Sequence, residues 1–173
     1  MPTNDNSISA TLVLDTSASM TFNGYVDITV IDSKAFVNCG EPGDKLAICN
    51  YDSSGHTPFP IAEVSETNNV LIDATTAIQD LSFNGPSTNI AAGLQQGIDQ
   101  LSSETNSRGL VLLSDGQNNA GSNPLNIPPP PYPVFACAMG PASDASLMQQ
   151  IAANSTNGQY YYVPEVVDMV DLT

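Results

Sequence analysis

Two strand-like runs of apolar residues, each stopping at an aspartate, constrain the fold of this chain most strongly. The first run, residues 8–14, ends at Asp15, and the second, residues 109–114, ends at Asp115. Strands that are buried on both faces read as nearly continuous apolar runs, which is typical of parallel sheets covered by helices. Both aspartates are therefore expected at the carboxyl end of a buried strand.

Four further segments favour strand structure. They are residues 45–50, 59–64, 134–139 and 160–163. The first two are separated by Asp52-Ser53-Ser54-Gly55, a sequence typical of turns, so they are predicted to form an antiparallel hairpin. Residues 117–133 contain four successive prolines, which lack the backbone donor that helices and central strands need. This segment is predicted to be a surface loop or a short polyproline stretch.

Apolar residues at helical spacing predict four helices between these strands. Their apolar stripes are Ile28, Ile31, Ala35 and Cys39; Val70, Leu71, Ala74, Ile78 and Leu81; Ile90, Leu94, Ile98 and Leu101; and Leu147, Met148 and Ile151. The second helix is expected to be capped by Ser65 or Thr67, the third is entered through residues 87–89, and Ser143-Asp144 opens the fourth. A short helix is expected from about Glu165 to the C-terminus.

Alternating strands and helices predict one α/β domain over residues 1–173, because the length and the hydrophobic content of 41% suit a single core. The expected fold is a Rossmann-like, doubly wound, mainly parallel sheet with one antiparallel edge strand and helices on both faces. In such sheets, ligands bind outside the carboxyl ends of the strands, where the strand order reverses. Asp15 and Asp115 are both predicted to lie there.

Hydroxyl and carboxylate side chains recur at this predicted edge. Asp15, Ser17 and Ser19 alternate after the first strand, Thr88 precedes a strongly amphipathic helix, and Asp115 follows the second strand. Taken singly, each is better explained by a turn or a helix cap than by a metal site. Together they provide an all-oxygen set that suits Mg²⁺, with Mn²⁺ or Ca²⁺ as alternatives, whereas zinc favours His or Cys.

Three segments carry a family resemblance: residues 15–19 (Asp-Thr-Ser-Ala-Ser), 85–90 (Gly-Pro-Ser-Thr-Asn-Ile) and 111–116 (Val-Leu-Leu-Ser-Asp-Gly). They resemble the metal-ion-dependent adhesion site of the von Willebrand factor A domain, and the order of strands and helices is similar to that family over nearly the whole chain. The resemblance implies that Ser17, Ser19 and Thr88 offer hydroxyls to the metal. It also implies that Asp15 and Asp115 act largely through bound waters and by orienting these hydroxyls.

The resemblance favours a non-enzymatic module for adhesion or complex assembly, which binds a protein whose Asp or Glu completes the metal shell. Two alternatives stay open: a metal-assisted hydrolase, and a structural or assembly subunit in which the metal only steadies the loops. The hydrolase has little support, because His56 is the only histidine and the sequence has neither a nucleophile elbow nor a phosphate-binding loop.

The net charge of -15 argues against nucleic acid as a partner, and the absence of a long apolar run argues against membrane insertion by this segment. Cys39, Cys49 and Cys137 lack zinc-site spacing and are expected to be buried, reduced thiols. Unpaired cysteines and the lack of a signal sequence favour the cytoplasm. Scarce Lys and Arg with abundant Asn, Ser and Thr suit a surface or secreted protein, so the location stays open.

Overall fold

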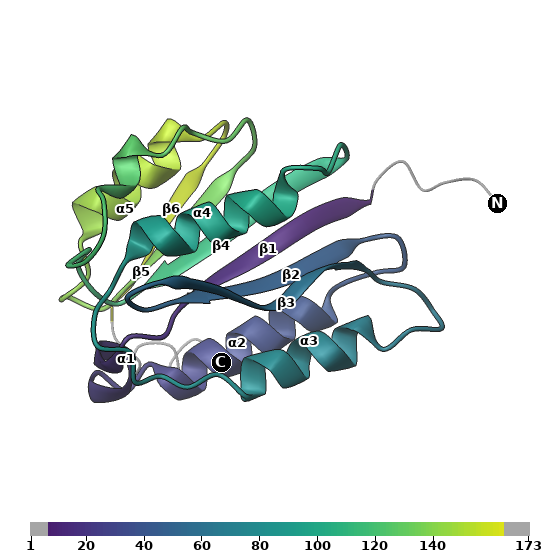
Figure 1. Ribbon diagram of the computed structural model, residues 1–173, viewed down its shortest axis with the longest axis horizontal. Coiled ribbons are helices and arrows are strands. Elements are labelled where there is room, and N and C mark those ends of the chain that lie inside the picture. Colours follow the sequence, from purple (N-terminus) through teal and green to yellow (C-terminus); the bar gives the residue numbers. More distant parts are fainter. Residues whose placement is uncertain (1–6, 165–173) are drawn as a thin grey trace.

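A single six-stranded sheet forms the centre of the computed structural model, which describes residues 7–164 (Figure 1). The strands are β1 (Ile8–Asp15), β2 (Lys45–Tyr51), β3 (Gly55–Glu63), β4 (Ser107–Ser114), β5 (Val134–Met139) and β6 (Gln159–Val163). Their order is β3-β2-β1-β4-β5-β6, and only the edge strand β3 runs antiparallel to its neighbour. The predicted doubly wound sheet with one antiparallel edge strand is thereby confirmed.

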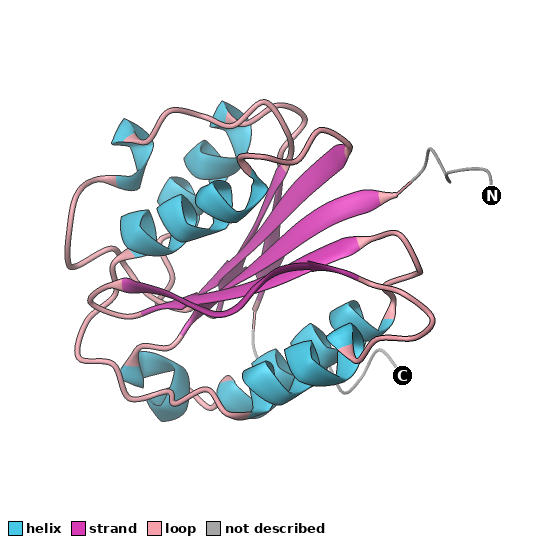
Figure 2. Ribbon diagram, turned by 45° about the vertical axis from the view of Figure 1, so that its right-hand side comes forward, coloured by secondary structure: helices cyan, strands magenta, loops and turns pink. Residues whose placement is uncertain are grey.

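Helices cover both faces of this sheet, as Figure 2 shows. One layer contains α2 (Val26–Asn38) and α3 (Val70–Gln79), and the opposite layer contains α4 (Ile90–Leu101) and α5 (Ala145–Asn154). Successive residues of β1 point to opposite faces: Val13 packs in the cluster with α4 and α5, while Leu12 and Leu14 pack with α2 and α3. Burial on both sides explains why this strand is continuously apolar.

The strand order reverses between β1 and β4, which lie side by side in the middle of the sheet. From β1 the chain builds the β2 and β3 side of the sheet, and from β4 it builds the β5 and β6 side. The loops that leave β1 and β4 therefore diverge, and their starting points remain uncovered by a crossover connection. Asp15 is the last residue of β1, and Asp115 directly follows β4.

Two short elements complete the described fold. The five-residue helix α1 (Ala18–Phe22) follows β1 and was not predicted, because its sequence carries no apolar stripe. Between β4 and β5 the only regular element is the 3-10 turn η1 (Pro124–Asn126), in agreement with the loop predicted for residues 117–133. The C-terminal helix predicted from Glu165 lies outside the described residues.

The face that α2 buries differs from the predicted stripe. The helix buries Thr29, Ser33 and Val37, whereas Ile31 of the predicted stripe is 61% exposed. Apolar residues occur on several sides of α2, so packing against the sheet decided which side is buried. Thr29, for example, places its Oγ1 3.8 Å from the sulfur of Met139 at the end of β5.

The cysteine prediction was wrong for one of the three residues. Cys39 is exposed because it directly follows the last residue of α2, in the connection that leads to β2. Cys49 is buried, Cys137 is partly buried, and all three are free thiols. Burial raises the pKa of Cys49 and of Cys137 to about 11, so both thiols stay protonated at neutral pH.

Helix caps were predicted correctly for α4 and α5 but not for α3. The side chains of Asn89 and Asp144 accept hydrogen bonds from the amides of Ala92 and Leu147, respectively. At α3 neither Ser65 nor Thr67 has this role; instead the side chain of Asn68 accepts from the amide of Val70 at 3.4 Å. Over residues 7–164, the helices are too short or too polar to cross a lipid bilayer.

Glycines allow α4 to approach the sheet closely. A Cβ atom at Gly93 would lie 2.2 Å from Cδ1 of Tyr51, and one at Gly97 would lie 2.6 Å from side-chain atoms of Leu110 and Val13. Because the Tyr51 ring is fully buried, it has no free space into which it can turn. Close packing of α4 against β2 therefore depends on the missing side chain of Gly93.

Gly93→Ala is expected to lower the free energy of unfolding by about 2 kcal/mol net, since the added methyl group overpacks the core at a cost of about 3 kcal/mol. This cost exceeds the gain of about 1 kcal/mol that alanine brings to a helix interior. Urea denaturation measures the change. Gln95→Ala, an exposed position on the same helix, is the matched control and should change stability by less than about 0.5 kcal/mol; equal effects at both positions would contradict the packing argument.

Candidate metal centre

Three loops meet where the strand order reverses, at the carboxyl ends of β1 and β4. The chain after β1 lies beside the loop that leads to α4: the amide of Ala18 donates to the Gly85 carbonyl at 2.8 Å, and the amide of Gly85 donates to the Thr16 carbonyl at 3.0 Å. Only glycine fits at position 85, because a Cβ there would lie 2.2 Å from Cβ of Asp52. This pairing brings Thr88 toward the end of β1.

The hydroxyls and carboxylates of these loops converge. Ser17 Oγ lies 2.9 Å from Ser19 Oγ, and Ser19 Oγ donates to Oδ1 of Asp115 at 2.8 Å. The third loop arrives at the same place, since a Cβ built on Gly116 would lie 3.5 Å from Thr88 Oγ1 and 3.8 Å from Ser19 Oγ. The structure thus brings together all five residues that the sequence singled out: Asp15, Ser17, Ser19, Thr88 and Asp115.

Both carboxylates are fully buried and hydrogen-bonded. Asp15 accepts from the amide of Ser17 at 2.9 Å and from the hydroxyl of Ser114 at 2.8 Å. Asp115 accepts from the Ser19 hydroxyl and, at 2.9 Å, from Nδ2 of Asn23. The two carboxylates therefore fix the backbone and hydroxyls around them.

Burial raises the pKa of Asp15 from 3.8 to about 6, and the charge of Asp115 contributes in the same direction. Neither carboxylate forms an ion pair within residues 7–164. The basic side chains of the chain interact elsewhere: Lys45 pairs with Glu104, Lys34 with Gln79, and Arg108 lies over the ring of Tyr132. Over residues 7–164, the negative charge of this centre is therefore not neutralised by a lysine or an arginine.

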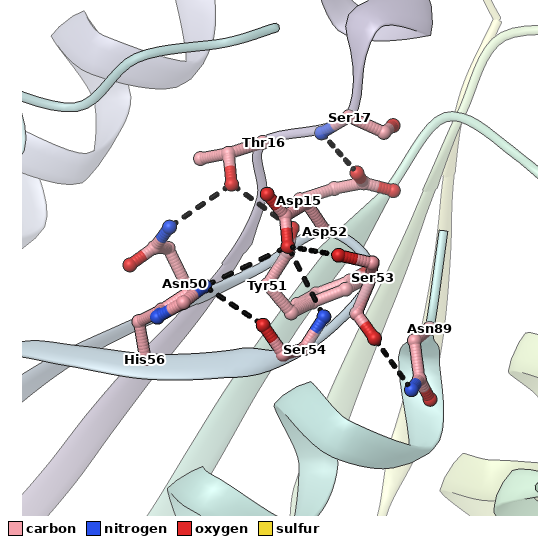
Figure 3. Close-up of polar contacts among 10 residues, drawn as sticks. All are labelled: Asp15, Thr16, Ser17, Asn50, Tyr51, Asp52, Ser53, Ser54, His56 and Asn89. Carbon is pink, nitrogen blue, oxygen red and sulfur yellow. Dashed lines mark hydrogen bonds and ion pairs between the residues drawn. The ribbon is translucent and has the colours of Figure 1, made fainter. Parts of the chain in front are cut away.

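The end of β2 supports the turn that carries Asp15 (Figure 3). Thr16 donates both its amide and its hydroxyl to the Tyr51 carbonyl, at 2.8 Å and 3.0 Å. Asn50 donates to the Thr16 hydroxyl at 3.0 Å. The phenol of Tyr51 donates to the Leu113 carbonyl of β4 at 2.8 Å, and burial raises the pKa of this phenol well above its ordinary value. β2 and β4 are therefore tied together beneath the centre.

The hairpin turn between β2 and β3 forms one rim of the centre. Figure 3 shows Asp52, Ser53 and Ser54 grouped beside Asn89 at the start of α4. The side-chain Nδ2 of Asn89 donates to the Ser53 carbonyl at 3.0 Å, and the backbone amide of Asn89 donates to the Asp52 carbonyl at 2.7 Å. His56 contacts Ser54 Oγ at 3.1 Å and lies 3.6 Å from Asp52. It therefore belongs to this rim and not to the group of hydroxyls formed by Ser17, Ser19 and Thr88.

Several residues that organise the centre were missed from sequence. Ser114 orients Asp15, Asn23 orients Asp115, and Asn118 and Asn119 hold the backbone around Thr88. Ser114 could have been found from its place beside Asp115 at the strand end. The three asparagines lie in segments without periodicity, and only the folded chain brings them to their partners.

Oxygen is the donor that this centre offers to a metal. Over the described residues, no three His, Cys, Asp or Glu side chains gather into a cluster able to hold a metal ion. Any ion held here would instead rely on the hydroxyls of Ser17, Ser19 and Thr88 next to two carboxylates. Such neutral and anionic oxygens suit hard cations such as Mg²⁺, Mn²⁺ or Ca²⁺, so the residues present fit a divalent cation.

Solved structures similar to this chain share its fold at low sequence identity. A von Willebrand factor type A protein from Catenulispora acidiphila has a TM-score of 0.80 and 13% identity, over 96% of this chain and 41% of that one. BatB from Bacteroides thetaiotaomicron has a TM-score of 0.74 and 14% identity, over 96% and 95% of the two chains. No curated protein sequence matches this chain significantly.

Proximal thread matrix protein 1 from the mussel byssus, in a structure with a zinc-occupied MIDAS motif, has a TM-score of 0.71 and 17% identity, over 91% of this chain and 44% of that one. This chain thus spans less than half the length of the Catenulispora and mussel structures. The family model of the von Willebrand factor type A domain matches residues 11–173. Domains of this family are generally protein-interaction modules, some of them metal-dependent. Since the match covers nearly the whole chain, this protein belongs to the von Willebrand factor type A domain family.

Proposed function

We propose that this chain is a protein-binding module, for adhesion or complex assembly, that depends on a divalent cation held by Asp15, Ser17, Ser19, Thr88 and Asp115. The module is not an enzyme in this proposal, and Mg²⁺ is the expected ion. An Asp or Glu of the partner protein completes the metal shell. Family membership supports the general role, and the geometry of the three loops supports the dependence on a cation.

One observation carries the proposal: Asp15 and Asp115 are both fully buried and no basic side chain of residues 7–164 pairs with either. A buried charge is costly unless an opposite charge or a metal ion lies next to it. The chain retains two such charges side by side, although hydrogen bonds from Ser114, Ser17, Ser19 and Asn23 offset part of the cost. A divalent cation would neutralise both.

The hydrogen bonds indicate how the roles divide among the five residues. Each carboxylate is used to hold a serine of the cluster: Asp15 holds the Ser17 amide and Asp115 holds the Ser19 hydroxyl. The hydroxyls of Ser17, Ser19 and Thr88 would therefore be the groups that contact the ion, and the carboxylates would orient them and act through water. Because the contacting groups are uncharged, a bound ion would keep its affinity for an external carboxylate.

The overall charge adds a condition on the partner. At -15, this chain repels acidic surfaces, so a partner's Asp or Glu would approach readily only from a neutral or basic surround. The sole histidine, His56, contacts Ser54 and Asp52 at the rim. Among residues 7–164, no general base other than the carboxylates is paired with the hydroxyls of Ser17, Ser19 or Thr88, which supports recognition over hydrolysis.

Asp15→Asn tests two effects of the buried charge: its destabilisation of the metal-free protein and its contribution to holding the cation. In EDTA at pH 7, the free energy of unfolding of the variant should exceed that of wild type by roughly 1–3 kcal/mol, because the raised pKa of Asp15, about 6, means that its charged form destabilises the fold. Urea denaturation measures this difference. In millimolar Mg²⁺, wild type should gain thermal stability and the variant should gain little.

Asp99→Asn is the matched control for that experiment, because it removes one negative charge from an exposed position of α4. Its stabilisation by Mg²⁺ should equal that of wild type. If wild type itself shows no Mg²⁺-dependent rise in melting temperature and no heat of binding in calorimetry, the cation-dependent function is wrong.

Recognition of a partner carboxylate can be measured on a peptide array in which each acidic peptide has a counterpart with Asn for Asp and Gln for Glu. The labelled chain is expected to bind a subset of acidic peptides in Mg²⁺, to lose them in EDTA, and to ignore every counterpart. Bound peptides should carry Lys or Arg near the acidic residue. Binding that persists in EDTA, or that is equal for the amide counterparts, would contradict the carboxylate bridge.

A further inference from the structure

We infer that Asn119 is a positioning residue of this centre, which sets the place of the Thr88 hydroxyl by clamping the Thr88 backbone; the inference rests on the proposed function. The Asn119 side chain accepts from the amide of Thr88 at 2.8 Å. The carbonyl of Thr88 accepts from the amides of Asn119 at 3.0 Å and Ala120 at 3.2 Å. Both polar groups of the Thr88 backbone are therefore held by one short segment.

Thr88 needs such a clamp more than the two serines of the centre do. Ser17 and Ser19 hydrogen-bond each other through their hydroxyls, and Ser19 also donates to Asp115. The Thr88 hydroxyl, by contrast, forms no hydrogen bond with another residue of the described chain, although Thr88 is only 3% exposed. Its position therefore depends on the backbone that carries the side chain, and Asn119 holds that backbone.

The neighbouring residue extends the clamp to the first turn of α4. Asn118 accepts from the amide of Ile90 at 2.8 Å through its side chain, and its own side-chain nitrogen donates to the Ser122 carbonyl at 3.1 Å. The first amides of a helix have no partner within the helix. Here the loop after β4 supplies one, in addition to the cap that Asn89 provides to Ala92.

The path of this loop also requires a glycine. Gly121 has a φ of +70°, and a Cβ at this position would lie 2.3 Å from Oδ1 of Asn89. The residue thus permits both the left-handed backbone and the close approach to the start of α4. The loop therefore packs directly against Asn89 and hydrogen-bonds to the backbone of Thr88.

The clamp links two parts of the centre that are distant in sequence. Asn118 and Asn119 follow Asp115 by only a few residues, so the segment that carries this carboxylate also holds Thr88. A displacement of the loop after β4 would accordingly move the Thr88 hydroxyl and Asp115 together. Affinity for a cation would then depend on Asn119, although this residue is exposed and is not one of the five predicted ligands.

The test uses Asn119→Ala and Asn119→Asp in the full chain, each compared with a variant of the exposed neighbour Gln117. Asn119→Ala removes the acceptor, whereas Asn119→Asp keeps an oxygen at Oδ1. Gln117→Ala controls for truncation in this loop, and Gln117→Glu controls for the added negative charge. Circular dichroism in EDTA verifies that each variant is folded.

The first measurement is hydrogen exchange of the Thr88 amide in EDTA, which requires no metal. Asn119→Ala is expected to speed this exchange about fivefold, the factor that corresponds to one lost hydrogen bond. Asn119→Asp and both Gln117 variants should exchange at the wild-type rate. Unchanged exchange in Asn119→Ala overturns the inference.

The second measurement is the Kd for Mg²⁺ by calorimetry. Asn119→Ala should bind about tenfold more weakly than wild type and Gln117→Ala, as is usual when a group that orients a metal ligand is lost. Asn119→Asp should bind at least as tightly as Gln117→Glu. Wild-type affinity in Asn119→Ala overturns the positioning role. Failure of wild type to bind Mg²⁺ overturns the proposed function instead, and the exchange measurement still decides whether Asn119 clamps Thr88.

Discussion

Asp15 and Asp115 carry two buried carboxylates side by side, at the point where the strand order reverses. Asp15 and Asp115 end or follow adjacent central strands, so parallel pairing of β1 and β4 forces their charges together. Mutual repulsion and loss of hydration oppose this arrangement. The surrounding loops offset part of the cost through amides and hydroxyls, and much of the local hydrogen bonding serves these two side chains.

The end of β2, the hairpin turn that follows it and the loop after β4 all support the centre. Tyr51 joins the end of β2 to β4 through its phenol, and the hairpin turn after β2 packs against the start of α4. On the other side, the loop after β4 returns to hold the backbone of Thr88. Rigid packing beneath and around polar loops is the arrangement that lets hydroxyls keep a fixed geometry toward a ligand.

Most of the strands and helices could be predicted because the spacing of their apolar residues indicates which side of each element is buried. The continuous apolar run of β1 indicated a strand covered on both faces, and the stripe from Ile90 to Leu101 indicated α4. α2 was predicted as a helix with the wrong buried face, because apolar residues lie on several of its sides and Ile31 proved to be exposed. Periodicity reveals an element when one side is apolar; it does not decide between two apolar sides.

The order of elements, the mainly parallel sheet and the five oxygen-bearing residues at strand and helix ends could all be inferred from sequence, because local patterns of apolar and polar residues encode these features. Folding was needed to place the hydroxyls of Ser19 and Thr88 near each other beside Gly116, and to bring Asn23 and Asn119 to the groups that they hold. The hydrogen bonds of Asn118, Asn119 and Asn23 join residues that are 28, 31 and 92 positions apart, and bonds over such separations leave no periodic trace in the sequence. They exist because the sheet brings the carboxyl ends of its central strands to one edge.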